Sequence, residues 1–206
     1  MNQDFWLPQF ERLGALWIHD GNAKRPHAQL TSGNHSNGFF DASKIIERPD
    51  VLTHVCQELV RKNPTGRVGA DRVFGSALGA CNLAYETARQ LNCLCGFTEP
   101  TPEKQMILKR FSFPVNSIIL VVEDVITTGG TTVKTIVALE QADAKVLPYV
   151  WAIFNRSGQS YLGERKIFAL IEKELPMWKP DECPLCQLGS VAVRPKANWA
   201  ALTAAY

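Results

Sequence analysis

Two adjacent carboxylates and a turn rich in hydroxyls and glycines are the residues of this chain best suited to chemistry. Glu123 and Asp124 follow the aliphatic run 118–122, and the turn 127–132, Thr-Thr-Gly-Gly-Thr-Thr, comes two residues later. Backbone N–H groups, threonine hydroxyls and a helix N-terminus together bind a phosphate dianion. Paired carboxylates accept hydrogen bonds from neighbouring sugar hydroxyls or help to hold a hydrated divalent cation. The pattern therefore predicts a site for a ligand whose phosphate lies one bond away from a ribose.

The alternative interpretation, that residues 118–132 form only a structural strand and turn, explains this run less well than a phosphate site does. Any parallel α/β protein has aliphatic strands followed by glycine turns, but two acids at a buried strand end are less common. An unpaired buried carboxylate costs several kcal/mol, so the two acids need hydroxyls, a metal or a basic partner. The run also lacks the Gly-x-x-x-x-Gly-Lys of a P-loop and the Gly-x-Gly-x-x-Gly of a dinucleotide fold. We therefore interpret it as a phosphate site.

The same stretch resembles the phosphoribosyl-pyrophosphate signature of the type I phosphoribosyltransferases. In that signature, aliphatic residues precede two acids, two further aliphatic residues and a Thr-Gly-Gly-Thr type loop. The resemblance implies that Glu123 and Asp124 contact the ribose 2- and 3-hydroxyls, and that the loop holds the 5-phosphate. The loop residues are then Thr127, Thr128, Gly129, Gly130 and Thr131.

A second turn of small residues, Gly75–Ala80, precedes another expected helix. Its small side chains let backbone N–H groups converge before a helix N-terminus, which suits an anion. A simple tight strand–helix turn has the same composition. In the resembling family this position is the pyrophosphate loop, which implies that Ser76, Ala77 and Leu78 bind pyrophosphate.

The segment Leu30–Asp41 resembles the hood of the orotate phosphoribosyltransferases, where a Ser-Gly pair is followed by Ser, two intervening residues and paired aromatics. The resemblance implies that Phe39 and Phe40 lie against a planar base. Many of these enzymes carry Lys where this chain has Thr31, so an orotate carboxylate would need another cation. Arg156 is apt, because a guanidinium binds a carboxylate through two parallel hydrogen bonds, although a surface arginine in a turn fits the sequence equally well.

Three further basic residues lie near the motifs: Lys104, Lys109 and Arg110. Phosphoribosyl pyrophosphate with magnesium carries so much charge that it needs cations besides backbone N–H groups. Many orotate enzymes have a Lys-x-His-Gly loop here that this chain lacks, and Lys104 is the nearest counterpart of its lysine. We assign Lys104 a catalytic role beside the acid pair, and Lys109 and Arg110 a role in binding pyrophosphate.

Strands that alternate with helices must position these motifs. Helices are predicted over residues 4–19, from Asp50 to about Arg61, around 83–91 and from the signature turn to about Gln141. Strands are predicted before Gly75 and over 94–98, 106–111, 118–122, 145–154 and 167–171, and Asn63–Gly66 breaks the chain. This order predicts an α/β fold with a mainly parallel central sheet, helices on both faces and a small N-terminal hood. Ligands of such sheets bind at the carboxyl ends of the strands.

The 206 residues allow one good-sized domain with small appendages. We expect an N-terminal helix and base-binding hood over residues 1–45, a phosphoribosyltransferase core over 46–175, and a C-terminal tail over 176–206 packed on the core. A net charge of +2 argues against nucleic-acid or membrane partners. The first residues lack the pattern of a signal peptide, so we expect a cytoplasmic protein.

Cys183-Pro-Leu-Cys186 has the spacing of a metal knuckle. One such pair supplies only half of a tetrahedral zinc site, and no His or second pair follows it. We favour a reduced or adventitiously oxidised pair and expect no metal bound by protein ligands, with a metal site as the alternative.

The motifs and the resemblance together predict transfer of a 5-phosphoribosyl group from phosphoribosyl pyrophosphate to N1 of orotate, a step of pyrimidine biosynthesis. The expected products are orotidine 5-monophosphate and pyrophosphate, and the expected cofactor is Mg²⁺ carried by phosphoribosyl pyrophosphate. Family members are homodimers, so the resemblance implies a homodimer. Two alternatives stay open: a phosphoribosyltransferase for another nucleobase and, more distantly, a non-catalytic regulator that senses phosphoribosyl pyrophosphate.

Overall fold

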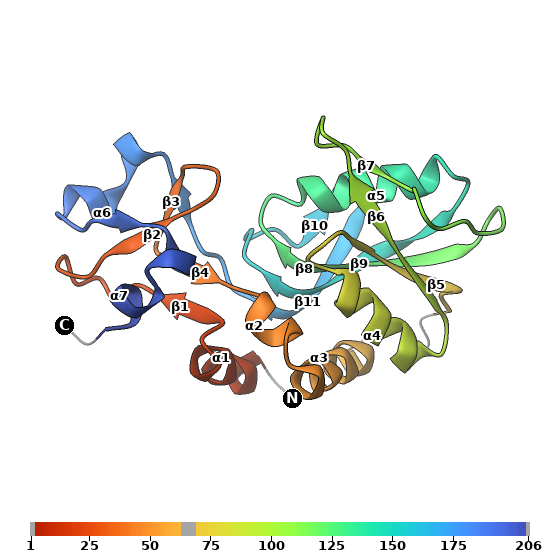
Figure 1. Ribbon diagram of the computed structural model, residues 1–206, viewed down its shortest axis with the longest axis horizontal. Coiled ribbons are helices and arrows are strands. Elements are labelled where there is room, and N and C mark those ends of the chain that lie inside the picture. Colours follow the sequence, from red (N-terminus) through yellow and green to blue (C-terminus); the bar gives the residue numbers. More distant parts are fainter. Residues whose placement is uncertain (1–2, 63–68, 205–206) are drawn as a thin grey trace.

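The computed structural model describes residues 3–62 and 69–204. It shows a larger lobe built around a twisted sheet, beside a smaller lobe that combines the start and the end of the chain (Figure 1). The chain break expected at Asn63–Gly66 lies outside the described residues. No helix of the described part has the length and apolar character needed to span a membrane.

The larger lobe, here called the core, contains a seven-stranded sheet in the order β10-β11-β9-β8-β5-β6-β7. Strands β11, β9, β8, β5 and β6 run parallel, and the short strands β10 and β7 pair antiparallel at the two edges. The strands are β5 (Arg72–Ser76), β6 (Leu94–Pro100), β7 (Met106–Ile107), β8 (Ile118–Ile126), β9 (Lys145–Asn155), β10 (Tyr161–Leu162) and β11 (Arg165–Glu172). The continuous aliphatic run of β8 suits a central strand that is covered on both faces.

Helices cover both faces of this sheet, as the sequence predicts (Figure 1). α3 (Pro49–Lys62) and α4 (Cys81–Leu91) lie on one face, where Leu52 and Leu83 join the larger apolar cluster. α5 (Gly130–Glu140) lies on the other face, where Ile136 packs with β8 and β9. The predicted α/β fold with a mainly parallel sheet is therefore confirmed.

The smaller lobe, here called the hood lobe, contains two small sheets. β1 (Leu16–Ile18) pairs with β4 (Gly38–Phe40), and a four-stranded sheet has the order β12-β3-β2-β13. The strands of that sheet are β2 (His27–Gln29), β3 (His35–Ser36), β12 (Met177–Trp178) and β13 (Ala192–Val193). Two of its strands therefore come from near the start of the chain and two from the tail.

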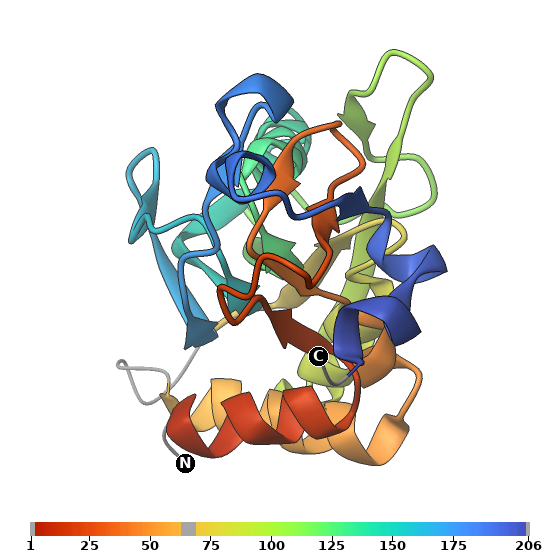
Figure 2. The same ribbon diagram turned by 90° about the vertical axis from the view of Figure 1, so that its left-hand side faces the viewer.

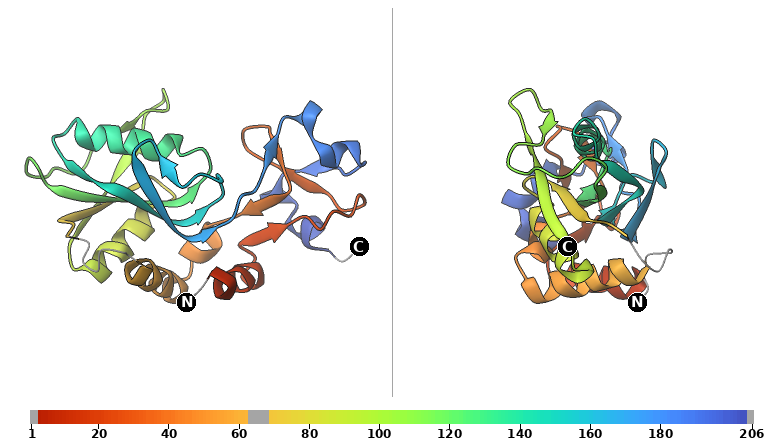
Figure 3. Two further views of the ribbon diagram at one scale, coloured as in Figure 1. Left: turned by 180° about the vertical axis from the view of Figure 1, so that it is seen from behind. Right: turned by 90° about the vertical axis from the view of Figure 1, so that its right-hand side faces the viewer.

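The tail lies on the hood strands, whereas we expected it to pack on the core. Its strands β12 and β13 pair with β3 and β2, and the side chain of Leu202 packs against Trp17 and Ala28. Seen from this end of the molecule, the blue tail segments surround the orange hood strands (Figure 2). The view from behind shows the strands leading into the hood lobe from the core (Figure 3). The remaining tail elements are the 3-10 helices Pro180–Glu182 and Pro195–Ala197 and the helices α6 (Pro184–Gln187) and α7 (Trp199–Thr203).

Two predicted elements are shorter than expected. The first helix, α1 (Gln3–Arg12), ends before Gly14, which has a left-handed φ of 69°, and Leu16–Ile18 then pair with β4. The helical spacing of apolar residues thus continues by coincidence into a strand, and the prediction of a helix to residue 19 was wrong. The strand predicted over 106–111 stops at Ile107, because its ladder with β6 ends there. A four-residue helix, α2 (Ser43–Ile46), connects the hood lobe to α3.

Candidate active site

Two cavities lie between the core and the hood lobe and share Phe39, Phe40 and Val125 in their walls. The first, about 530 Å³, is called here the acid cavity, and its lining includes Asp41, Ser43, Glu47, Leu78, Gly79, Asn82, Asp124 and Lys196. The second, about 290 Å³, is called the arginine cavity, and its lining includes Leu30, Thr31, Ser32, Thr127, Arg156 and Met177. The acid cavity lies at the carboxyl ends of β5 and β8, and the arginine cavity lies at those of β8 and β9. An α/β sheet binds its ligands at these strand ends.

The predicted phosphate loop connects β8 to α5. Gly129 has a φ of 74°, and a Cβ at that position would lie 2.1 Å from Cδ2 of Leu162, so only glycine fits this turn. Within the described part of the chain, no side chain caps the N-terminus of α5. Its first N–H groups have no partner within the helix and carry the positive end of the helix dipole. With Thr128 and Thr131 exposed beside them, these groups can receive a phosphate.

The two acids of the pair have different surroundings, although their carboxyl groups lie close enough to interact. Glu123 is 5% exposed, and its Oε2 accepts hydrogen bonds from Ser76 Oγ (2.8 Å) and Thr132 Oγ1 (3.0 Å). Burial, followed by the charge of Asp124, raises the pKa of Glu123 to about 8. Glu123 lines neither cavity. Its hydrogen bonds instead connect Ser76, in the second predicted anion turn, to Thr132 at the start of α5.

Asp124 faces the acid cavity. Its Oδ1 accepts a hydrogen bond from the N–H of Val125 at 2.8 Å. A Cβ at Gly79 would lie 2.5 Å from Oδ2 of Asp124, so a side chain there would collide with the carboxylate. Asp124 is therefore the acid of the pair that a ligand can reach, and it lies against the second predicted anion turn.

That second turn, residues 76–80, lies at the edge of the acid cavity. Ser76 is turned inward, with its hydroxyl 3.0 Å from Oγ1 of Thr135 as well as bonded to Glu123. Leu78 follows a cis peptide bond and is 87% exposed. The N–H groups of Leu78 and Gly79 have no hydrogen-bond acceptor among the described residues, which leaves them for an anion. The side chain of Ser76 is a structural contact, whereas the backbone of the turn suits pyrophosphate.

Arg156, at the end of β9, is a buried cation at the arginine cavity. It is 5% exposed, and its Nη2 donates to Ser36 Oγ (2.8 Å) and to the carbonyl oxygen of Leu175 (3.2 Å). Its buried Nε has no hydrogen-bond partner, and none of the ion pairs formed by the described residues involves it. Desolvation lowers the pKa of Arg156 to about 10, so the guanidinium stays charged at neutral pH.

The two phenylalanines of β4 have different surroundings. Phe40 is 5% exposed and stacks on Phe154, with ring centroids 4.5 Å apart. Phe39 is less buried and contacts Trp199 of the tail, with centroids 6.4 Å apart. Both rings form part of the walls of the two cavities. Phe39 is the freer of the two to lie against a planar ligand.

The three cations predicted near the leaving group lie outside both cavities. Lys104 and Lys109 are exposed in and after the β6–β7 connection, and Arg110 forms an exposed ion pair with Glu99 (Nε–Oε1 2.7 Å). In this conformation the structure therefore does not bring them together with Asp124.

Sequence reasoning missed a cation that does reach the acid cavity. Lys196, in the tail, lies in the cavity wall with its Nζ 3.1 Å from Oδ1 of Asp41. Ser43 and Asn82 also line this cavity. Nothing in the basic run around Lys196 indicates its destination, because only the pairing of β13 with β2 brings the tail to the cleft.

Solved structures resemble this fold. An orotate phosphoribosyltransferase from Aeropyrum pernix superposes with a TM-score of 0.64 at 19% identity, covering 80% of this chain and 92% of that one. An adenine phosphoribosyltransferase from Rhodothermus marinus gives 0.52 at 17% identity, over 65% and 86% of the two chains. The fold is therefore that of the type I phosphoribosyltransferases.

Relatives in sequence define the family more closely. An orotate phosphoribosyltransferase from Desulforamulus reducens is 33% identical over 195 residues, covering 95% of this chain and 97% of the relative. Another from Chlorobaculum parvum is 34% identical over 183 residues, covering 89% and 90%. No protein-family model matches the chain. At this identity and coverage, the chain belongs to the orotate phosphoribosyltransferase family.

Proposed function

We propose that this enzyme transfers the 5-phosphoribosyl group of phosphoribosyl pyrophosphate to N1 of orotate, giving orotidine 5-monophosphate and pyrophosphate in pyrimidine biosynthesis. The observation that supports orotate most directly is Arg156, a buried guanidinium without a carboxylate partner among the described residues, in the wall of a cavity. A planar base that carries a carboxylate supplies the missing partner. Adenine, which has no acid group, does not.

The two cavities divide the substrates between them. In our proposal the 5-phosphate binds at residues 127–131, the ribose hydroxyls at Asp124, and the pyrophosphate at the backbone of residues 76–79 and at Lys196. The base then lies in the arginine cavity against Phe39. Because the two cavities share a wall, a base and a ribose bound in this way would be neighbours. Holding two reactants side by side supplies much of an enzyme's rate enhancement.

The chemistry requires little proton transfer from the protein. As pyrophosphate leaves, C1 of the ribose gains oxocarbenium character, and the negative charge of Asp124 stabilises the developing cation. Orotate N1 is already acidic, so no strong general base is needed. Glu123 acts as a positioning residue, because its hydrogen bonds to Ser76 and Thr132 join the two anion-binding turns.

Magnesium carried by phosphoribosyl pyrophosphate fits the donors of the acid cavity. Mg²⁺ prefers oxygen ligands, and Asp124 and Asp41 offer carboxylates there. Bound with the substrate, the ion neutralises charge on the leaving pyrophosphate. Lys104, Lys109 and Arg110 can assist the same charge only if the exposed β6–β7 connection moves toward the cleft. The homodimer is inferred from the family resemblance alone, and the cytoplasmic location stays an expectation drawn from the sequence.

The test is the loss of orotate ultraviolet absorbance when enzyme, orotate, phosphoribosyl pyrophosphate and magnesium are mixed. Wild type turns over, and Asp124→Asn lowers kcat/KM by about 100-fold or more, the loss typical of one preorganised electrostatic group. Glu123→Gln is the matched control, a neighbouring acid changed in the same way but outside the cavities. Absence of wild-type turnover, with phosphoribosyl pyrophosphate still bound in calorimetry, would exclude orotate as the base and lead to a screen of other bases.

A further inference from the structure

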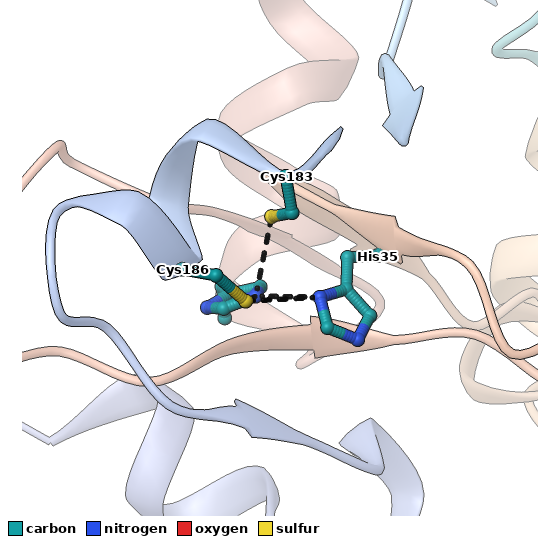
Figure 4. Close-up of side chains that lie close together, drawn as sticks. His35, Cys183 and Cys186 are labelled. Carbon is teal, nitrogen blue, oxygen red and sulfur yellow. Dashed lines mark hydrogen bonds between the residues drawn. The ribbon is translucent and has the colours of Figure 1, made fainter. Parts of the chain in front are cut away.

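Four side chains with metal-binding atoms meet inside the hood lobe, away from both cavities. His27 comes from β2, His35 from β3, Cys183 from the residue before α6, and Cys186 from α6 itself. Figure 4 shows the sulfur of Cys186 pointing toward the ring of His35, with Cys183 beside them. One donor atom from each of the four lies within 4.8 Å of all the others. Three of the side chains are buried and the fourth, Cys186, is partly buried.

The distances between these atoms match the edges of a tetrahedron around one ion. Zinc lies about 2.3 Å from thiolate sulfur and about 2.0–2.1 Å from imidazole nitrogen, so the tetrahedral edges are about 3.6 Å for S···N and about 3.3 Å for N···N. Nε2 of His27 lies 3.5 Å from each sulfur and 3.1 Å from Nδ1 of His35. Cys186 Sγ lies 3.3 Å from Nδ1 of His35. These four edges thus fall within about 0.3 Å of the values for zinc.

A hydrogen bond outside the cluster fixes which nitrogen of His27 faces inward as an acceptor. The hydroxyl of Ser190 donates to the carbonyl oxygen of Arg25 at 2.6 Å, because a carbonyl can only accept. Nδ1 of His27, 2.8 Å from the same hydroxyl, must therefore be the donor in that contact. The proton on Nδ1 leaves Nε2 with a lone pair directed at the other three atoms. Metal-bound histidines are usually oriented by such an outer hydrogen bond.

We propose that Nε2 of His27, Nδ1 of His35 and the sulfurs of Cys183 and Cys186 bind one structural zinc ion. Two thiolates and two neutral imidazoles balance the charge of Zn²⁺, which suits a buried position. Sulfur and imidazole ligands in a tetrahedron favour zinc over magnesium or calcium, which take oxygen. Four protein ligands leave no open position for a substrate, so the ion has a structural role.

The ion would fasten the tail to the hood. The strands β12 and β13 pair with the hood over only two residues each, too few to be stable alone. An ion bound by both His27 and Cys183 would join residues that lie 156 positions apart in the chain. His35 is followed directly by Ser36, whose hydroxyl accepts a hydrogen bond from Arg156. An ion that fixes the position of His35 would therefore also help to fix Arg156 in the wall of the arginine cavity.

Metal content is the direct test and does not depend on any enzymatic assay. Protein purified without chelator is expected to contain one zinc per chain by elemental mass spectrometry. Cobalt substitution is expected to give the visible bands of a tetrahedral thiolate site. Cys183→Ser and Cys186→Ser are each expected to lower zinc retention at least tenfold, whereas Cys93→Ser, a thiol distant from the cluster, retains the full content. His35→Cys replaces the ligand and is expected to keep zinc, which distinguishes lost ligation from lost folding.

Wild-type protein provides a measurement that no folding defect can obscure. A strong chelator is expected to lower its Tm by about 5 °C or more, and added zinc is expected to restore it. Folded wild type that holds no zinc and takes up neither zinc nor cobalt would refute the site. A disulfide between Cys183 and Cys186 in protein isolated under reducing conditions would refute it as well. Since metal is measured directly, failure here leaves the proposed transferase activity untouched, and the reverse is also true.

Discussion

The core and the hood sides of the cleft treat their buried charged residues in opposite ways. On the core side, Glu123 is surrounded by hydroxyl groups, and its raised pKa of about 8 keeps it largely protonated at neutral pH. On the side that faces the hood, Arg156 follows the core strand β9 and donates to Ser36 of the hood. It stays charged, has no acid beside it among the described residues, and keeps a buried Nε without a partner. The protein itself supplies hydrogen-bond partners for Glu123, whereas it leaves one buried N–H group of Arg156 without a partner.

This difference assigns separate tasks to the two sides. The core presents backbone N–H groups, threonine hydroxyls and Asp124, which fit any phosphoribosyl donor. The hood side leaves a cation that an anionic ligand can complete, because burying a guanidinium without a carboxylate beside it costs free energy that an anion returns. Base selectivity should therefore depend on Arg156, and binding of the phosphoribosyl group should not.

Removing the charge of Arg156 is the strongest way to test that division. Arg156→Gln is expected to raise KM for orotate about 100-fold, since losing one partner of a buried charge pair costs about 2–5 kcal/mol. KM for phosphoribosyl pyrophosphate is expected to change less than about threefold, because its proposed contacts lie in the other cavity. Steady-state kinetics with each substrate varied in turn gives both values.

Two controls separate recognition of the carboxylate from a folding defect. Arg156→Lys keeps the charge but loses the paired hydrogen bonds, so its KM for orotate should lie between wild type and Arg156→Gln. Ser36→Ala removes one hydrogen bond of Arg156 while the guanidinium stays. If Arg156→Gln weakens the binding of orotate and of uracil, which lacks the carboxylate, by the same factor, Arg156 does not select the base.

Lys196 is an exception to this separation of tasks, because it belongs to the tail in the hood lobe but lines the acid cavity. Lys196→Ala is expected to raise KM for phosphoribosyl pyrophosphate about tenfold, about 1.4 kcal/mol, and the effect should shrink with added salt. Lys179→Ala is the matched control, an exposed tail lysine paired with Glu182 and absent from both cavities. If the two variants bind phosphoribosyl pyrophosphate equally well, Lys196 has no part in the site.

The two sides also differ in how far the sequence reveals them. The core motif could be predicted because Glu123, Asp124 and the phosphate loop are contiguous, so strand, acids and turn appear in one stretch. In the structure only Asp124 of the two acids lines a cavity, whereas Glu123 accepts hydrogen bonds from Ser76 and Thr132. Our prediction gave both acids the same role, because nothing in the contiguous motif distinguishes the acid that lines the cavity from the one that does not.

The hood lobe could not be predicted in the same way, because its sheet joins segments about 150 residues apart. The spacing of Cys183 and Cys186 suggests half of a zinc site, and we looked for the other half further along the chain. Its proposed partners, His27 and His35, precede the cysteines and become neighbours only when β12 and β13 pair with the hood. The same pairing brings Lys196 to the acid cavity. Long-range strand pairing leaves no local pattern in such short strands.

The smallest expected effect on turnover belongs to Glu123, and its main effect is on stability. The folded pKa of about 8 lies above the usual value of 4.5, so the contribution of Glu123 to stability is complete below pH 4.5 and is lost as the pH rises toward 8. Glu123→Gln cannot ionise, and its amide oxygen can still accept from Ser76 and Thr132. We therefore expect the Tm of Glu123→Gln to rise relative to wild type between pH 5 and pH 8, with kcat within about threefold of wild type.

Glu86→Gln is a control of the opposite sign. Hydrogen bonding to Arg89 lowers the pKa of Glu86 to about 2, so its contribution is present above pH 4.5 and is lost as the pH falls toward 2. Glu86→Gln should therefore be less stable than wild type at neutral pH, where Glu123→Gln is more stable. Thermal melts at several pH values measure both differences. A loss of activity in Glu123→Gln as large as that in Asp124→Asn would mean that Glu123 contacts the ribose after all, and the core side would then also depend on its ligand for completion.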